Sequence, residues 1–150
     1  MEKNPFIIRV YALIINQQNE ILLSDEFQMG MRMTKFPGGG LQYGEGTIEC
    51  LHREALEEFG QDIEITGHFY TTDFFQEALF YPHHQLISIY YLARFPEPPR
   101  FLISSIPFDF AEEKEGNQSF RWIRIENLDP AMITLPVDKK AAEMLRQKYR

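Results

Sequence analysis

The sequence almost lacks cysteine, and its single thiol belongs to Cys50. A lone cysteine excludes an internal disulfide and is typical of proteins from a reducing compartment. Long hydrophobic runs are also missing, because the apolar stretch at residues 6–15 is interrupted by Arg9 and is too short to span a bilayer. No small-residue cleavage site follows it. We therefore expect a soluble, cytoplasmic protein with no membrane partner.

Positive charge is scarce as well. The chain has 15 Lys and Arg residues against 22 Asp and Glu residues, which gives a net charge of −7. Proteins that bind nucleic acid polymers need a basic surface to meet the phosphate backbone, so this class does not fit. An acidic protein that handles a small phosphorylated ligand would need local cations, supplied by Arg, Lys or a metal ion.

Internal repeats, low-complexity segments and flexible linkers are absent too. The 150 residues fit a single domain, residues 1–150, that is long enough to bury a real core. The composition, 44% hydrophobic and 25% charged, is that of an ordinary globular protein. A disordered or fibrous protein is therefore excluded.

Hydrophobic patterning predicts strands mixed with two helices. Residues 6–15 are apolar on both faces apart from Arg9, as in a central strand that is covered on both sides. Further strands are predicted at residues 20–24, 62–66, 68–75, 85–95 and 119–125, and a loop at residues 25–34. Helices are predicted at residues 47–59 and 137–149. This mixture indicates an α/β fold, a sandwich with helices on both faces of a sheet.

The first helix has clear boundary signals. Thr47 can cap its N-terminus, Glu49 suits the first turn and Gly60 supplies a left-handed stop. Its apolar stripe consists of Ile48, Leu51, Ala55 and Phe59. In the second helix Asp138 is the predicted cap.

Three carboxylates, Glu54, Glu57 and Glu58, lie together on one flank of this stripe, and Glu58 is close enough to it to be half buried. Like charges at this spacing repel each other, and the negative end of the helix dipole makes them less favourable still. They form either a solvated acidic face or the ligands of a hard divalent cation, Mg²⁺ or Mn²⁺. The preceding glycines, at residues 38–40, favour the metal site because they let backbone approach a ligand closely.

The same segment resembles a known motif. Residues 39–61 are similar to the Nudix box: Gly, five residues, Glu, seven residues, then Arg-Glu, an aliphatic residue, any residue, Glu-Glu, any residue, Gly and an aliphatic residue. The matching residues are Gly39, Glu45, Arg53, Glu54, Ala55, Glu57, Glu58 and Gly60. Ala55 is smaller than usual and Gln61 replaces the last aliphatic residue, with Ile63 as a candidate for that packing role. Since both departures concern packing, the sequence is identified as a member of the Nudix hydrolase family of MutT-like type.

The resemblance implies a Nudix-type α/β/α sandwich with a mixed central β-sheet. It also implies a hydrolase that cleaves the diphosphate linkage of a nucleoside diphosphate derivative or a nucleoside triphosphate, with Mg²⁺ or Mn²⁺ as cofactor. By the motif, the metal would be held by Glu54, Glu57 and Glu58 with a backbone carbonyl of Gly38 or Gly39. The motif also implies that Glu45 pairs with Arg53, whereas the residues alone leave either Glu45 or Glu49 as the partner.

The sequence offers two candidate positions for the general base. In some family members it is a glutamate of the box, here Glu54, and in others a carboxylate of a late loop. Lys114-Glu115-Gly116 resembles the corresponding loop of MutT, so Glu115 is our preferred candidate, with a solvated charged loop as the alternative.

Substrate contacts are less constrained. Arg9, Arg32 and Lys35 are the candidate phosphate ligands, although Arg9 could instead snorkel at a strand end and the other two could be solvated loop charges. Aromatic residues within 68–75, 79–84 and 89–91 could stack on a nucleobase or form core. Family markers of ADP-ribose, coenzyme A and NADH hydrolases are missing, which leaves a compact nucleotide hydrolase.

Two other classes remain as alternatives. A catalytically silent sensor could use the same scaffold to bind a nucleotide or sugar phosphate, but its glutamates would not need to be intact. An isomerase acting on isopentenyl diphosphate would need a suitably placed cysteine, and Cys50 within the box is not so placed. The expected partner is a small nucleotide-type molecule, and many relatives form homodimers, so we expect a homodimer here.

Overall fold

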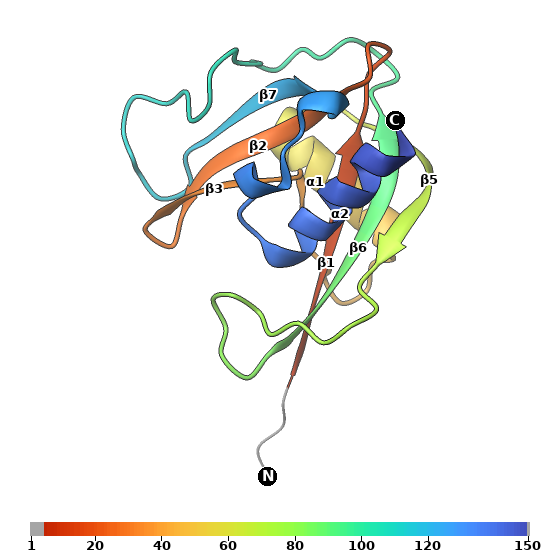
Figure 1. Cartoon of the computed structure of the whole chain (residues 1–150), viewed down its shortest axis with the longest axis vertical. Coiled ribbons are helices and arrows are strands. Elements are labelled where there is room, and N and C mark those ends of the chain that lie inside the picture. The colour runs from red at the N-terminus through yellow and green to blue at the C-terminus, as the bar shows by residue number, and fades with distance from the viewer. Residues whose placement is uncertain (1–4, 150) are drawn as a thin grey trace.

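The computed structural model describes residues 5–149, which form two β-sheets and two α-helices (Figure 1). The strands are β1 (Phe6–Ile14), β2 (Glu20–Gln28), β3 (Met31–Lys35), β4 (Gly38–Gly40), β5 (Glu64–Thr71), β6 (Gln85–Arg94) and β7 (Gln118–Arg124). The helices are α1 (Thr47–Phe59) and α2 (Pro136–Lys148), with short 3₁₀ turns at Ile125–Asn127 and Pro130–Met132.

The predicted α/β class is confirmed, but the β-structure is divided. A four-stranded mixed sheet has the order β4-β1-β6-β5, with β1 and β6 parallel, and a three-stranded antiparallel sheet has the order β3-β2-β7. We expected one central sheet. The chain departs from that expectation because β4 and β6 occupy both edges of β1, so β2 pairs with β3 and β7 instead.

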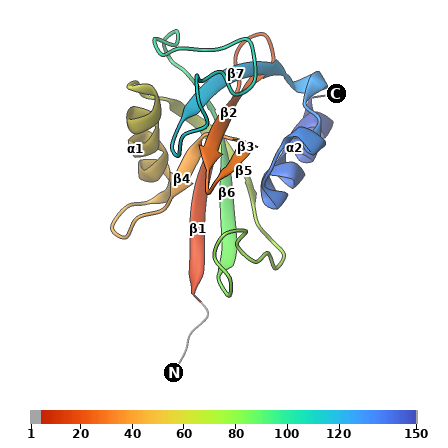
Figure 2. The same ribbon diagram turned by 90° about the vertical axis from the view of Figure 1, so that its left-hand side faces the viewer.

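Strand β1 lies between the two helices, as its apolar faces predict. Tyr11 and Leu13 belong to the core cluster that contains residues of α2, whereas Val10, Ala12 and Ile14 belong to the cluster that contains residues of α1. Figure 2 shows the two helices on opposite sides of the strands. This alternation confirms the sandwich.

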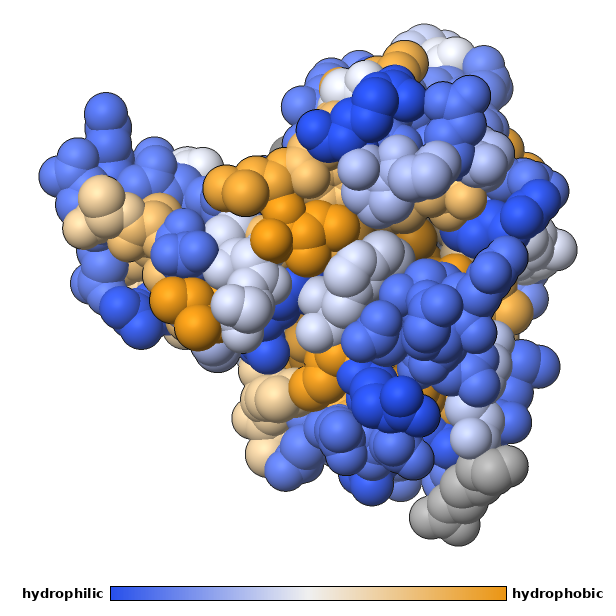
Figure 3. All heavy atoms as spheres, turned by 90° about the horizontal axis from the view of Figure 1, so that it is seen from above, coloured by the Kyte–Doolittle hydropathy of each residue, from blue (hydrophilic) through white to orange (hydrophobic). Residues whose placement is uncertain are grey.

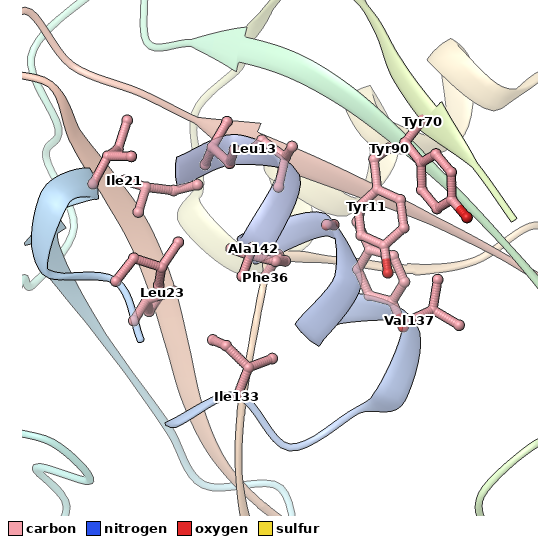
Figure 4. Close-up of a cluster of buried hydrophobic side chains, with 14 of the residues drawn as sticks. Tyr11, Leu13, Ile21, Leu23, Phe36, Tyr70, Tyr90, Ile133, Val137 and Ala142 are labelled. Carbon is pink, nitrogen blue, oxygen red and sulfur yellow. The ribbon is translucent and has the colours of Figure 1, made fainter. Parts of the chain in front are cut away.

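The rings of Tyr11, Tyr90 and Tyr70 lie side by side in the α2 core (Figure 4). Tyr11 stacks on Tyr90 with ring centroids 5.2 Å apart, and Tyr90 stacks on Tyr70 at 6.2 Å. Because Tyr11 also lines the cleft described below, this stack joins the core to the candidate site.

The loop predicted at residues 25–34 was wrong. Strand β2 continues to Gln28, and β3 begins at Met31 after a turn in which Met29 and Gly30 both have positive φ. Polar residues suggested a loop, but Asp25 is fully buried in an ion pair with Arg121 of β7. Pairing across strands makes this polar segment compatible with a sheet.

The two strands predicted at residues 62–66 and 68–75 are one strand, β5, which ends at Thr71. Register shifts occur between Ile65 and Gly67 and between His68 and Tyr70. Such bulges let one strand continue through a break in its alternation, which explains why the pattern looked like two strands.

The bounds of α1 are confirmed, and Gly60 ends it in a left-handed conformation. The predicted cap and part of the stripe are wrong. Gly46 occupies the N-cap position and donates its N–H to the Glu49 carboxylate at 2.9 Å. Ile48 is exposed, whereas Cys50 is buried in its place among the α1 core.

Helix α2 begins one residue earlier than predicted, at Pro136, and Asp138 is not its cap. The Asp138 carboxylate is buried instead, where it accepts hydrogen bonds from the hydroxyl of Tyr90 and from the backbone N–H of Phe36. The pattern misled us because an acidic residue in a first helical turn usually faces solvent.

Seen from above, the surface is mainly hydrophilic, with apolar side chains gathered near its middle (Figure 3). A mixture of this kind is ordinary for a globular protein. Neither helix of residues 5–149 has the length and apolar character needed to cross a membrane.

Candidate active site

A cleft of about 400 Å³ lies where β1, β2, β3, β4 and α1 meet. This volume is within the range usual for ligand pockets. Its polar part is lined by Arg9, Tyr11, Glu26, Lys35, Gly38, Gly39, Gly40, Glu54 and Glu58. Its apolar part is lined by Ile7, Met29, Met33, Ala78, Leu79, Phe80, Tyr81, Leu86, Leu135 and Pro136.

The glycines of β4 allow α1 to approach the cleft. A Cβ on Gly39 would overlap the Glu54 carboxylate, so only glycine leaves room for it there. Gly38 has a φ of 151°, and a Cβ at this position would collide with the backbone of Val10 and Tyr11. These two close approaches explain why positions 38 and 39 are glycine and bring Glu54 to the edge of the cleft.

Arg53 connects the loop before α1 to the acidic face. Its Nε and Nη2 donate to the two oxygens of Glu45 at 2.9 and 2.7 Å, and Nη2 also donates to the Gly40 carbonyl at 3.0 Å. The hydrogen bond from Arg53 holds the pKa of Glu45 at about 2. The pairing with Glu45 was predicted, and it fixes the glycine loop against the helix.

Arg53 also contacts two glutamates of the acidic face. Its Nη1 lies 2.9 Å from Glu54 Oε1 and 3.2 Å from Glu57 Oε2. These ion pairs offset part of the electrostatic repulsion between the neighbouring glutamates of α1. Glu57 is largely exposed, whereas Glu54 is mostly covered.

Glu58 has a different environment. It accepts a hydrogen bond from Gln118 Nε2 at 3.3 Å through Oε1, whereas Oε2 is buried with no hydrogen-bond partner. Burial raises the pKa of Glu58 to about 7. The half-buried position predicted for this side chain is confirmed, and a buried orphan oxygen is costly unless a ligand meets it.

Among residues 5–149, no three carboxylate, histidine or cysteine side chains converge as a metal site requires. Arg53 is one reason, because it draws Glu54 and Glu57 toward itself. The donors nevertheless fit a hard divalent cation, since they are carboxylate oxygens, one of them is an orphan, and Gly39 lets the Glu54 carboxylate lie against the backbone of β4.

Two of the three predicted phosphate ligands line the cleft. Arg9 Nε donates to the Tyr11 hydroxyl at 2.8 Å, and no ion pair within residues 5–149 involves Arg9. Lys35 Nζ lies 3.2 Å from Glu26 Oε2. Burial alone would lower the pKa of Lys35, but the adjacent Glu26 raises it above the ordinary value, so the side chain stays charged.

Arg32 and Glu115 do not line the cleft. Arg32 is exposed, pairs with Glu113 at 2.6 Å and lies over the ring of Phe108. Glu115 accepts hydrogen bonds from the backbone N–H groups of the β2–β3 turn, at 2.6 Å from Met29 N and 3.4 Å from Gly30 N. Neither side chain lines the cleft, although Met29, to which Glu115 is hydrogen-bonded, does.

The aromatic segments divide between core and cleft. Tyr70 and Tyr90 are buried in the α2 core, so they are not available for stacking. Phe80 and Tyr81 line the cleft, from a loop that is closed by the hydrogen bond from Ala78 N to the His84 carbonyl. This segment is the one that can meet a nucleobase.

Sequence reasoning missed Glu26 and Gln118. Glu26 lies on β2 at the polar end of the cleft, and Gln118 is its register partner on β7. A signal for Glu26 was present in the sequence: it is a charged residue two positions after Ser24, where the preceding strand could continue. No local signal marks Gln118, since 92 residues separate it from Glu26.

The NUDIX domain family model matches residues 5–147. Solved structures with the same fold include a Nudix hydrolase from Nitrosomonas europaea (TM-score 0.68, 19% identity, covering 97% of this chain and 91% of that one). A MutT protein from Methanosarcina mazei Go1 gives a TM-score of 0.65 at 22% identity, over 100% and 99% of the chains. A MutT Nudix hydrolase from Burkholderia pseudomallei gives 0.69 at 19% identity, over 94% and 98%. No curated protein matches the chain.

A sandwich of two helices around these sheets is the fold that the chain shares with these Nudix and MutT hydrolase structures. The chain belongs to the Nudix hydrolase family, because the family model covers nearly all of it. The resemblance seen in residues 39–61 is thus confirmed. Enzymes of this family generally hydrolyse nucleoside diphosphate derivatives and typically use divalent metals.

Proposed function

We propose that this enzyme cleaves a phosphoanhydride bond in a nucleoside diphosphate derivative or nucleoside triphosphate, with Mg²⁺ or Mn²⁺ as cofactor. One observation carries the proposal: Glu58, whose buried Oε2 has no hydrogen-bond partner, lines the same cleft as the cations Arg9 and Lys35. Carboxylates that can hold a metal and cations that can hold phosphate are thereby close enough to share one substrate.

Glu54, Glu57 and Glu58 would hold the cation, together with a backbone carbonyl of Gly38 or Gly39. When bound, such an ion neutralises phosphate charge and lowers the pKa of a coordinated water. Glu54 and Glu57 can move from Arg53 to the cation. Arg53 would still be paired, because it keeps its two hydrogen bonds to Glu45.

Arg9 would bind a phosphate of the substrate. The Tyr11 hydroxyl occupies its Nε, which leaves the two Nη groups for a ligand. A guanidinium presents paired donors that match two phosphate oxygens. Lys35 would add a point charge nearby, although Glu26 already neutralises much of it.

Glu54 is our choice for the proton acceptor over Glu115. Glu54 lines the cleft, whereas Glu115 lies at the β2–β3 turn with its oxygens bonded to Met29 N and Gly30 N. A general base must come within hydrogen-bond reach of the water that it deprotonates. The apolar part of the cleft would hold the nucleoside and exclude bulk water from it.

A product-resolved hydrolysis screen tests the proposal. Purified protein with Mg²⁺ or Mn²⁺ would be offered nucleoside triphosphates, sugar nucleotides, ADP-ribose and dinucleoside polyphosphates, with Glu58→Gln as the matched variant. We expect at least one compound to be cleaved by the wild type and not by the variant. Nucleotide binding without cleavage anywhere in the panel would contradict the proposal and favour a sensor.

A further inference from the structure

Gln118 begins β7 at a point where three elements meet. It is partly buried and is the register partner of Glu26 on β2. Its amide extends to α1, where it reaches the carboxylate of Glu58. It is therefore a side chain from outside the box that contacts a box glutamate.

The amide nitrogen of Gln118 has three acceptors within hydrogen-bond distance. These are Ser24 Oγ at 2.9 Å, Glu26 Oε2 at 3.1 Å and Glu58 Oε1 at 3.3 Å. Ser24 uses its own proton to donate to Glu26 Oε2 at 2.7 Å, so its Oγ is free to accept. Gln118 thus bridges two carboxylates that come from different elements.

This bridge gives the two oxygens of Glu58 different surroundings. Oε1 accepts from Gln118, whereas Oε2 is buried and has no partner. Glu26 is satisfied by other donors, because Ser24 and Lys35 also reach its Oε2. The donor that orients Glu58 is therefore the amide of Gln118.

We propose that Gln118 is a positioning residue that holds Glu58 Oε1, so that Oε2 is presented to a divalent cation. The inference rests on the proposed function, in which Glu58 is a metal ligand. Ligating carboxylates depend on hydrogen bonds from such outer partners, and losing one typically costs about 10- to 100-fold in metal affinity.

The test measures Mn²⁺ binding directly, by electron paramagnetic resonance of the free ion in the presence of protein. Gln118→Met keeps the size of the side chain and removes the donor. We expect Mn²⁺ to bind the variant about 10- to 100-fold more weakly than the wild type. Gln76→Met is the matched control, since the Gln76 side chain donates to the backbone carbonyl of Glu77 and makes no hydrogen bond to a box residue. It should bind Mn²⁺ as the wild type does.

Activity supplies a second readout. The Mn²⁺ concentration for half-maximal turnover should rise in Gln118→Met, while turnover at saturating Mn²⁺ stays near the wild-type value. A merely structural role would lower the unfolding temperature and turnover without moving the Mn²⁺ dependence. If Gln118→Met does not fold, Gln118→Asn keeps an amide that is one methylene too short to reach Glu58, and the same weakening is expected.

The outcomes separate this inference from the proposed function. If the wild type binds no Mn²⁺, or if Glu58→Gln binds it unchanged, the proposed metal site is wrong. If Glu58→Gln weakens binding but Gln118→Met and Gln118→Asn do not, only the role of Gln118 is overturned.

Discussion

The ammonium group of Lys35 lies 3.2 Å from the Glu26 carboxylate, and the two side chains are only 6% and 7% exposed. The pair joins β3 to β2 at the polar end of the cleft, where Lys35 also lies over the ring of Tyr11. A buried pair contributes little relative to an apolar pair, but removing one partner leaves an uncompensated charge.

Lys35→Met should therefore destabilise the protein by about 3 kcal/mol, because Glu26 keeps only its neutral donors. The double variant Lys35→Met/Glu26→Met should recover much of that loss. Urea denaturation of the three proteins measures both effects. Equal midpoints for Lys35→Met and the wild type would contradict the expectation.

Glu58→Gln should lower turnover at least about 100-fold, since it removes a charge from the proposed metal ligands, and Glu57→Gln should act in the same direction. Neither substitution should unfold the protein. In particular, Glu58→Gln neutralises a carboxylate whose burial is unfavourable. Steady-state kinetics and circular dichroism check the two parts. An active variant with unchanged metal dependence would disprove the assignment.

Removing divalent ions should abolish turnover in the wild type. Treatment with EDTA followed by gel filtration should give an inactive protein that regains activity on addition of Mg²⁺ or Mn²⁺, because hard cations prefer carboxylate oxygens. Turnover that persists in the metal-free protein would rule out the proposed cofactor.

Glu115→Gln tests the late-loop candidate for the base, with Glu54→Gln beside it as the variant of the proposed base, which is also a proposed metal ligand. We expect a loss of at least about 100-fold for Glu54→Gln, since general-base catalysis contributes on the order of 10² to 10⁴. Glu115→Gln should change turnover little, because its carboxylate bonds to the amides of the β2–β3 turn. A larger loss of turnover in Glu115→Gln than in Glu54→Gln would indicate that Glu115 of the late loop is the general base.

Tyr11→Phe should raise KM by about 3- to 10-fold and leave kcat nearly unchanged, because one hydrogen bond that orients Arg9 is lost. Arg9→Lys keeps the charge but loses the paired donors, so its KM should rise further. Initial-rate kinetics on the substrate found in the screen measures both. A fall in kcat with constant KM would place Tyr11 in the chemical step instead.

Asp138 predicts a pH dependence of stability. Burial raises its pKa from 3.8 to about 6, with the Tyr90 hydroxyl opposing part of that shift. The folded protein therefore holds this proton more tightly than the unfolded chain, so the carboxyl lowers stability as the pH rises from about 4 to 6. At about 1.4 kcal/mol per pH unit the loss is about 3 kcal/mol.

Asp138→Asn should flatten the stability curve in this window, since an amide does not ionise. Chemical denaturation of both proteins at several pH values between 4 and 7 makes the comparison. Curves that run parallel for the variant and the wild type would mean that another group dominates the pH dependence.

The sequence alone determined the local half of the site. The spacing from Gly39 to Gly60 predicts the helix and its end, because each depends on residues only a few positions apart, and the family resemblance implies the pairing of Arg53 with Glu45. Strand β1 was also predicted from the sequence, because both of its faces are apolar and a strand of this kind must be covered on both sides.

The tertiary structure decided which charges share the cleft. Lys35 and Arg32 look alike in sequence, yet β3 places Lys35 against Glu26 and leaves Arg32 outside with Glu113. Successive residues of a strand point to opposite faces, so Arg32 and Lys35, three residues apart, lie on opposite faces of β3.

Buried polar groups were the other matter that only folding could settle. Asp138 looked like a helix cap, and Gln118 carried no signal, because the partners that satisfy them lie 48 or more residues away along the chain. Local sequence determines where a helix begins and which side chains share its face. The free energy of a buried charge depends on which distant donors surround it, and that is fixed only when the sheets and helices pack together.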